Sequence, residues 1–285
     1  MNRKAFSLIE LSIVILIIGI LIAGVVQGNN LFLKAKLKSA QSLTQSSPVQ
    51  GIADLMAWYE TTQDKSFGQL RPNNQDAIGR WLDINPQRQA IDAIQNTASN
   101  KPLFIEDCIN GLPCLKFDGS NDLLDTNIDI SYTKMPSMTI FGVFNNNSGL
   151  TAYQTLMGQD NGGWDRDIFV KWPGGGGFAA GTFGMVKIAG IDTLLVTKFF
   201  SLVIKNGISN GSKAYINGSS TPVTFTENHT DSGGNPTTTI GAMDSSSGHP
   251  LSGNIAEIII YGRALKNEER MAVEKYLSQK WGIKE

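Results

Sequence analysis

The sequence of 285 residues predicts an α+β protein that is mainly β. Three observations lead to this prediction. Residues 6–26 are almost entirely apolar, short β-rich segments separated by turns follow residue 52, and residues 267–282 have the periodicity of an amphipathic helix. The expected architecture is a long amino-terminal helix, an antiparallel β-sandwich and a carboxyl-terminal helix. The formal net charge is −1 with both signs mixed along the chain, so nucleic acid is not an expected partner.

The run from Phe6 to Val26 has the length of a membrane span. About 20 helical residues at about 1.5 Å each cover a hydrocarbon core of about 30 Å. Arg3 and Lys4 precede the run, which places this end on the cytoplasmic side and the rest of the chain outside. An amphipathic pattern then continues to about residue 46, and Pro48 marks the expected end of the helix.

Glu10 stands near the start of this apolar run. A charged side chain in hydrocarbon costs at least about 2.5 kcal/mol, so such a residue suggests a function. A cleaved secretory signal has a shorter apolar core, a small-x-small cleavage site and rarely a Glu at this position, so that alternative fits poorly.

The stretch "RKAFSLIELSIVILIIGIL" resembles the amino terminus of type IV pilins and pseudopilins over roughly residues 1–45. The resemblance implies that a prepilin peptidase cuts between Ala5 and Phe6, removes a leader of residues 1–5 and methylates the new terminus. The family usually has Gly before the cut, where this chain has Ala5. Many pilins also carry a Pro in the second half of the buried helix, where this chain has glycines at positions 19, 24 and 28.

The resemblance implies a role for Glu10 in assembly. The new amine at Phe6 of an arriving subunit would pair with Glu10 of a docked one, and each charge would offset the desolvation of the other. The implied partners are other pilin subunits, the peptidase and the membrane, and the implied location is a cytoplasmic-membrane precursor followed by an extracellular filament. A plain single-span anchor, with Glu10 at the cytoplasmic interface, remains the alternative.

The chain after residue 52 predicts a sandwich closed by a helix. The expected strands lie in segments that alternate or are rich in β-formers: "ADLMAWYE", "LKFD", "SMTIFGVFN", "DIFVKW", "FFSLVIK", "SKAYING", "TTTIGAM" and "NIAEIIIYGRAL". Asn-Gly steps predict a hairpin in residues 203–218, and "WPGGGGFAAG" is expected to be a mobile loop tip. The last helix places Val273, Tyr276 and Trp281 on one face, with Asn267 as the expected cap and Gly282 as the end.

These pieces resemble the concanavalin A-like, laminin G-like jelly rolls of bacterial surface proteins over roughly residues 52–285. The residues that carry the resemblance are "ADLMAWYE", "GRWLDIN", "INGLPCLKFDGSNDLL" and "GNIAEIIIYGRALKNEERMAVEKYLSQKWGI". That family contains sugar binders, protein binders, calcium-dependent modules and spacers, so the fold alone does not identify a ligand.

Cys108 and Cys114 are the only cysteines in the sequence. The Asn-Gly step between them predicts a tight reversal that brings the thiols within bridging distance. An exported domain would form this disulfide in an oxidising compartment, and two reduced, half-buried thiols are the alternative.

The sequence predicts a protein that is not an enzyme. A retaining glycosidase needs two carboxylates about 5 to 5.5 Å apart, and no predicted strand carries two alternating acids. Glu257 is the only acid in "NIAEIIIY". His229 and His249 lie in polar loops without a second ligand at zinc spacing, and no nucleophile elbow marks a Ser-His-Asp site.

Two acidic turns are candidates for calcium, since hard oxygen ligands in glycine-rich loops suit this ion. One contains Asp118 and Asp122, and the other contains Asp160, Asp165 and Asp167. The alternative is that these residues only form turns, and it is stronger for the first turn.

Trp164 and Trp172 lie close to the second turn in sequence and could stack on a sugar face, although tryptophan in a sandwich is more often part of the core. The sequence therefore predicts a leader (1–5), an assembly helix (6–47) and a β-sandwich head (51–285). The predicted function is a pilin-like filament subunit that attaches to a surface glycan or protein. The alternative is an anchored binding module that does not polymerise.

Overall fold

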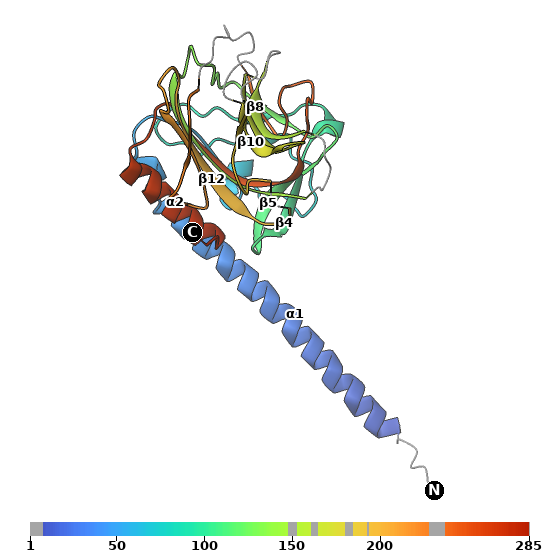
Figure 1. Ribbon diagram of the computed structural model, residues 1–285. Helices are drawn as coiled ribbons and strands as arrows, with labels where there is room; N and C mark the ends of the chain where they lie inside the picture. The colour runs from blue at the N-terminus through green and yellow to red at the C-terminus, as the bar shows by residue number, and fades with distance from the viewer. Residues whose placement is uncertain are drawn as a thin grey trace.

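A computed structural model describes residues 8–147, 153–160, 165–179, 185–192, 194–227 and 237–284. A single long helix, α1 (Leu8–Gln45), projects from a β-sandwich head, and a second helix, α2 (Asn267–Trp281), lies beside the end of α1 (Figure 1). The predicted order of long helix, sandwich and terminal helix is confirmed.

The helix α1 ends close to where Pro48 predicts its end. Its last residue is Gln45, and Pro48 itself precedes a short 3₁₀ turn at Val49–Gly51. Two further 3₁₀ turns occur at Asp64–Phe67 and Ala98–Asn100. The chain therefore leaves the helix through a tight connection and enters the first strand almost at once.

The head consists of two antiparallel sheets, called sheet A and sheet B here. Sheet A has the order β14-β13-β12-β7-β16-β5-β4 with β1 also paired to β16, and sheet B has the order β11-β10-β9-β8-β15-β6-β3-β2. The strands of sheet A are β1 (Leu55–Glu60), β4 (Leu103–Ile109), β5 (Leu112–Asp118), β7 (Ser137–Asn146), β12 (Lys198–Lys205), β13 (Ser212–Ile216), β14 (Val223–Phe225) and β16 (Ser252–Tyr261). Those of sheet B are β2 (Arg80–Trp81), β3 (Ala93–Ile94), β6 (Leu124–Thr126), β8 (Gln154–Gln159), β9 (Arg166–Trp172), β10 (Gly175–Ala179), β11 (Met185–Lys187) and β15 (Thr238–Ile240).

The two faces of sheet A pack in two different cores. Side chains such as Ile258 and Ile260 of β16 join the main core between the sheets. Their neighbours Ile259 and Tyr261 point to the other face, because successive strand residues alternate. That second core is covered by α2 and by the carboxyl-terminal part of α1, which contributes Ala40.

The helix α2 buries the face that its periodicity predicts, including Val273, Tyr276 and Trp281. Gly282 ends the helix at φ 64°, as expected. The predicted start is displaced by one residue. Lys266 is the capping residue, and its backbone N–H donates to the Glu269 carboxylate at 2.9 Å.

The Asn-Gly hairpins form as predicted. Asn110 and Gly111 have φ values of 51° and 70°, which turn β4 directly into β5. The segment "WPGGGGFAAG" contradicts the expectation of a mobile loop tip, because Gly175–Ala179 is strand β10 between β9 and β11. A β-carbon on Gly177 would lie 1.8 Å from the Val186 carbonyl oxygen, so glycine here permits close strand packing.

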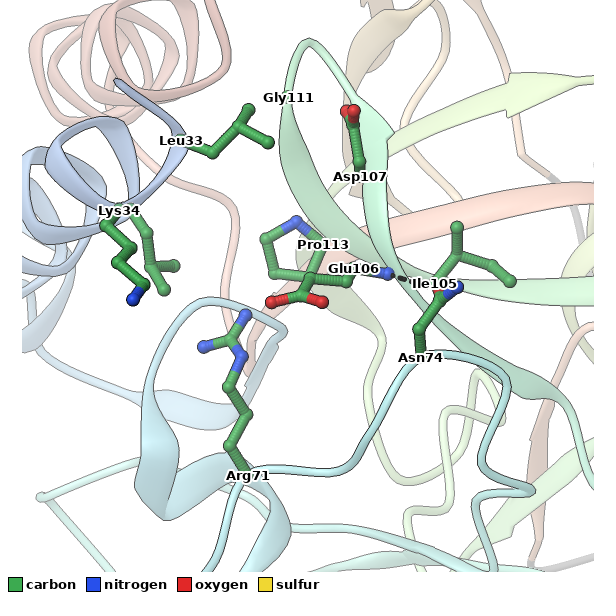
Figure 2. A pocket seen from close by; sticks show the side chains of 10 residues that line it. Leu33, Lys34, Arg71, Asn74, Ile105, Glu106, Asp107, Gly111 and Pro113 are labelled. Atoms are coloured by element: carbon green, nitrogen blue, oxygen red, sulfur yellow. Dashed lines mark hydrogen bonds between the residues drawn. The ribbon is translucent and has the colours of Figure 1, made fainter. Parts of the chain in front are cut away.

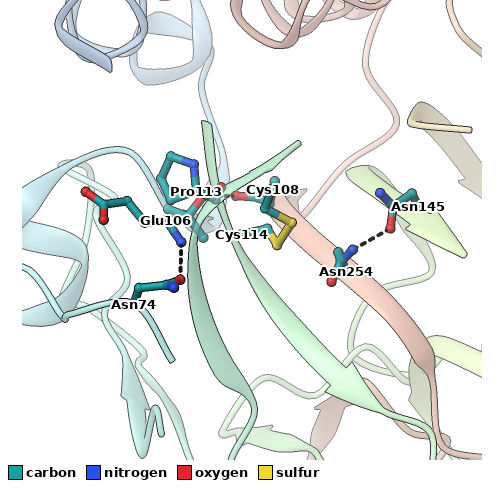
Figure 3. Close-up of a disulfide and its surroundings, with 9 residues drawn as sticks. Asn74, Glu106, Cys108, Pro113, Cys114, Asn145 and Asn254 are labelled. Carbon is teal, nitrogen blue, oxygen red and sulfur yellow. Dashed lines mark hydrogen bonds between the residues drawn. A yellow bond between two sulfur atoms is a disulfide. The ribbon is translucent and has the colours of Figure 1, made fainter. Parts of the chain in front are cut away.

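Cys108 and Cys114 form a disulfide between β4 and β5, with their α-carbons 5.8 Å apart (Figure 3). Cys114 is fully buried in the second core. The bridge spans the irregular part of this strand pair, whose register shifts between Ile105 and Ile109. It therefore joins the edge hairpin of sheet A on the side where α1 packs.

Candidate functional site

The amino-terminal half of α1 lies outside the head. Its large apolar side chains from Leu8 to Val25 are 46% to 85% exposed. Among the described residues, α1 is the one helix with the length and composition to cross a membrane, with a mean hydropathy of 2.9 in its most apolar stretch and none of that stretch buried. Such a surface is stable in lipid or against other apolar helices.

The residues predicted for processing and assembly lie at the start of this helix. Ala5 and Phe6 are outside the described residues. Glu10 is in the first turn of α1 and is exposed on the helix surface. This first turn is at the end of α1 that is farthest from the head (Figure 1).

Side chains from the last turns of α1 bind the head directly. Gln41 Nε2 donates to the Thr62 carbonyl oxygen at 2.9 Å, and Gln63 Nε2 donates to the Gln41 carbonyl oxygen at 2.9 Å. The hydroxyl groups of Thr44 and Tyr276 are 3.2 Å apart. All of these groups are buried, so the end of α1 is part of the head rather than a flexible tether.

A buried charge network lies between α2 and sheet A. Lys280 Nζ is 2.7 Å from Glu60 Oε2 and 3.0 Å from Glu257 Oε2, and all three side chains are fully buried. The indole nitrogens of Trp58 and Trp281 each donate to Glu257 at 2.7 Å. Burial alone would raise the pKa of Glu60, but the Lys280 charge and hydrogen bonds from Lys280 and Thr62 outweigh it and lower that pKa.

Sequence reasoning missed this network, although it noted the single acid Glu257. Glu60 and Glu257 are opposite each other in the β1–β16 pair, so the two carboxylates come from different strands. The available signal was a charged residue inside each apolar strand together with Lys280 on the apolar face of α2. Because the pair is enclosed and bound to Lys280, it cannot reach a glycan substrate.

A cleft of about 310 Å³ opens where α1 leaves the head (Figure 2). Two cationic side chains, Lys34 and Arg71, and two carboxylates, Glu106 and Asp107, line it (Figure 2). The remaining lining residues are Leu33, Leu37, Asn74, Ile105, Gly111 and Pro113. With charges of both signs in balance, the cleft indicates no particular class of ligand.

The described residues of the predicted acidic turn, Asp160, Asp165 and Asp167, lie where β8 ends and β9 begins in sheet B. Asp167 in β9 points away from the main core, because its neighbour Ile168 points into it. Asp167 is 0% exposed, and among the described residues neither carboxylate oxygen has a hydrogen-bond partner. Burial, with the charges of Asp160, Asp165 and Asp244, raises its pKa well above the usual value. Asp160, Asp165 and Asp244 thus act on Asp167 electrostatically, but the four carboxylates do not form a cluster that could hold a metal ion.

The segment 241–251 between β15 and β16 lies against β8, and its Met243 lies close to Gly158, the strand partner of Asp167. The Thr155 N–H donates to the His249 carbonyl oxygen at 2.9 Å, and the Gly241 N–H donates to the Leu156 carbonyl oxygen at 2.8 Å. These bonds hold the segment against β8. Within the described residues, no three His, Cys, Asp or Glu side chains are grouped closely enough to hold a metal ion by themselves.

Aromatic side chains lie on the same side of sheet B, around Phe169 of β9. The Tyr153 and His249 rings are tilted by 33° with centroids 4.9 Å apart, and Tyr153 meets Phe169 edge-on at 5.9 Å. Trp172 meets Phe169 at 6.3 Å and is half-buried. Trp164, the other residue predicted to stack on a sugar, lies outside the described residues. We call Tyr153, Phe169, Trp172 and His249 the aromatic group.

The first acidic turn has the geometry of a turn former. Asp118 Oδ1 accepts hydrogen bonds from the Ser120 and Asn121 N–H groups, and Asp122 Oδ2 accepts one from the Asp118 N–H at 2.9 Å. Burial and the Asp118 charge raise the pKa of Asp122 to about 6. His229, the other loop histidine, is outside the described residues.

Comparison with known families supports the interpretation of the amino terminus. Residues 1–26 match the family model of the prokaryotic N-terminal methylation motif. The motif and the apolar helix together fit a precursor inserted in a membrane. The match ends at residue 26 and does not extend to the head. No curated protein matches the chain significantly.

The solved structures that resemble the protein include sialidases. Trypanosoma rangeli sialidase in complex with sialic acid has a TM-score of 0.55 at 15% identity, covering 87% of this chain and 38% of the sialidase chain. The same enzyme with the inhibitor DANA has a TM-score of 0.51 at 13% identity, covering 85% and 38%. The protein thus spans 38% of the length of these relatives. At this identity the similarity shows a shared β-sandwich fold and does not identify an activity.

Proposed function

We propose that this protein is a type IV pilin-like filament subunit that carries a β-sandwich head for attachment to a surface ligand. One observation carries the proposal: α1 is a single helix whose amino-terminal half is exposed and largely apolar while its last turns pack in the head. A removable signal would not be continuous with the core of the mature domain. The exposed half needs lipid before assembly and neighbouring helices after it.

The methylation motif supports the proposed processing. The peptidase would remove residues 1–5 between Ala5 and Phe6, and the new amine would pair with Glu10 of a neighbouring subunit. The two charges would leave water together, which offsets part of the cost of burying each one. Residues 6–47 form the proposed assembly helix, and the last turns of this helix pack into the proposed head of residues 51–285.

The proposed ligand of the head is a glycan, bound on the side of sheet B that carries the aromatic group. Half-buried Tyr153 and Trp172 offer ring surface of the kind that stacks on sugars, with aspartates nearby to accept hydroxyl hydrogen bonds. Trp164 belongs to the same proposal. The fold shared with a sialidase that binds sialic acid is consistent with a glycan ligand, and a protein ligand is the alternative outcome of a binding assay.

The proposed role is structural and not enzymatic. Its support is the enclosure of Glu60 and Glu257 around Lys280, which leaves that carboxylate pair without access to a substrate. Incubation of the purified protein with a panel of sialosides and other glycosides tests this directly. Hydrolysis above the background of a Glu257→Gln variant would contradict the proposal.

The second candidate is an anchored binding module that never polymerises. A membrane-spanning α1 is compatible with this candidate as well as with the filament subunit. Mass spectrometry of the mature chain separates the two. A chain that begins with methylated Phe6 and is recovered in a sheared filament fraction supports the filament subunit. An intact Met1, with all protein in the membrane fraction, would overturn the filament proposal and favour the anchor.

A further inference from the structure

A β-bulge in β9 turns Trp172 to the outer face of sheet B, the face that points away from the main core. Val170 points into that core, so regular alternation would send Trp172 there as well. The pairing of β9 with β8 and with β10 shifts by one residue between Phe169 and Trp172. Such a bulge re-aims the side chains that follow it. Trp172 therefore lies on the outer face, where its ring meets that of Phe169 edge-on with centroids 6.3 Å apart.

The neighbouring strand β10 has no side chains at its central positions on this face. A β-carbon on Gly177 would lie 2.8 Å from Trp172 Cη2, and one on Gly175 would lie 2.8 Å from Lys187 Cε. Lys187 belongs to β11, where it is opposite Gly177. Trp172 and Lys187 thus reach over the same strand from its two sides. The absence of side chains on β10 is what brings an aromatic ring and an ammonium group together here.

The ammonium group of Lys187 is available for a ligand. Lys187 is exposed and makes no ion pair with any of the described residues. Lys171, the other cation in this part of sheet B, lies 3.9 Å from Asp192, which already compensates its charge. A cation beside an aromatic ring matches a sugar that carries a carboxylate, because the sugar packs on the ring while its carboxylate pairs with the amine.

The acidic residues of sheet B lie toward the other end of β9. Asp165 precedes the strand and Trp172 ends it, about 20 Å away at about 3.3 Å per residue. Asp244 acts electrostatically on His249 of the aromatic group. The outer face therefore changes from negative to positive along β9. An anionic sugar is repelled from the aspartates and attracted to Lys187, so this distribution of charge gives it one preferred position.

We propose that the head binds a glycan through a sugar that carries a carboxylate, with the sugar ring against Trp172 and the carboxylate paired with Lys187. The inference rests on the proposed glycan-binding function and names the class of sugar. Lys187 is then the residue that determines specificity for acidic over neutral glycans. Sialic acids and uronic acids share this chemistry, and paired probes distinguish them.

The test measures binding of the full-length protein in detergent by isothermal titration calorimetry with two pairs of probes. One pair is sialyllactose and lactose, and the other is trigalacturonic acid and its methyl ester. The acidic member of at least one pair is expected to bind about three- to tenfold more tightly than its neutral partner. High salt should reduce this preference, because it screens exposed charges. The pair that shows the preference identifies the source of the carboxylate.

The possible failures of this test are distinguishable. If the neutral members bind as tightly as the acidic ones, or if only neutral glycans of a wider panel bind, the inference is overturned while the proposed glycan-binding function stands. If neither the two pairs nor the panel bind, both are overturned and a protein ligand is favoured.

Variants of Lys187 test its role in the same assay. Lys187→Gln is expected to abolish the preference for the acidic member, with the affinity for the neutral member and the melting temperature unchanged. Lys187→Arg should keep the preference because it keeps the charge. Lys205→Gln is the matched control, since Lys205 is an exposed lysine at the end of β12 in sheet A. An undiminished preference in the Lys187→Gln variant would overturn the inference.

Discussion

Glu60 and Glu257 lie opposite each other on adjacent antiparallel strands, and Lys280 of α2 binds both carboxylates in a site without solvent. Three parts of the chain therefore meet at one buried cation. The same site reaches α1, since Tyr276 donates to Glu257 at 2.7 Å and lies 3.2 Å from Thr44. The network joins sheet A, the closing helix and the end of the assembly helix.

Replacing Lys280 with Met is expected to destabilise the protein by about 3 to 5 kcal/mol, because it leaves two buried carboxylates without their cation. Urea unfolding followed by tryptophan fluorescence measures the loss. Lys275→Met on the exposed face of α2 is the matched control, with an expected change within about 0.5 kcal/mol. Equal effects of the two variants would show that the network contributes little.

The stability contributed by Glu60 is expected to depend on pH. Its pKa is lowered in the folded protein, so the contribution is complete above the pKa of the unfolded chain and is lost as the pH falls through the lower folded value. The difference in unfolding free energy between wild type and Glu60→Gln should therefore narrow between pH 7 and pH 3. The exposed Glu106→Gln variant should show no comparable trend. A difference that widens toward low pH would reverse the assigned sign.

Truncation of α1 is expected to show that the head includes its last turns. A chain that begins at Leu33 keeps Ala40 and Thr44 and should unfold in one cooperative transition. A chain that begins at Pro48 leaves the second core open and should be less stable by more than about 3 kcal/mol, or aggregate. Calorimetry and gel filtration of both chains give the answer. Identical melting curves would confirm the simpler boundary at residue 47 that the sequence predicts.

The disulfide is expected to add about 2 kcal/mol, because it closes only a short loop between Cys108 and Cys114. Unfolding with and without reductant measures this contribution. A Cys108→Ala/Cys114→Ala variant is the control, since it should be insensitive to reductant. Two free thiols on alkylation of the unreduced, exported protein would contradict the bridge.

Replacing Glu10 with Leu is expected to leave membrane insertion and cleavage intact while incorporation into filaments falls at least tenfold. The proposed reason is the loss of the pair with the amine at Phe6, which favours assembly in register. Gln27→Leu is the matched control, because it also replaces an exposed polar residue of α1 with Leu. Immunoblots of sheared filaments and membranes measure both variants. Normal incorporation of the Glu10 variant would favour a lone anchor.

The local features of this fold could be predicted from the sequence. The apolar run and the amphipathic turns after it specify α1, Pro48 limits its length, and the step Asn110-Gly111 selects a tight hairpin that brings the two cysteines together. Each of these features depends on backbone preferences or side-chain spacing within a few residues. The methylation motif belongs to the same class, since it is read within the first 26 residues.

Only the tertiary structure decided what the buried charges do. Lys280 and Glu60 are separated by 220 positions, so no local pattern could pair them. Asp167 and Gly158 are opposite each other in the β8–β9 pair, and Met243 lies close to Gly158 although it comes from a distant part of the chain. Because these contacts are not local, the sequence alone indicated an acidic turn and not a buried carboxylate. The glycines of β10 likewise indicated a loop in the sequence. Only the pairing of β10 with β9 and β11 shows that they belong to a strand. The periodicity of the sequence determined the helices and strands. The free-energy cost of burying charged groups and backbone polar groups determined how those helices and strands pack against one another.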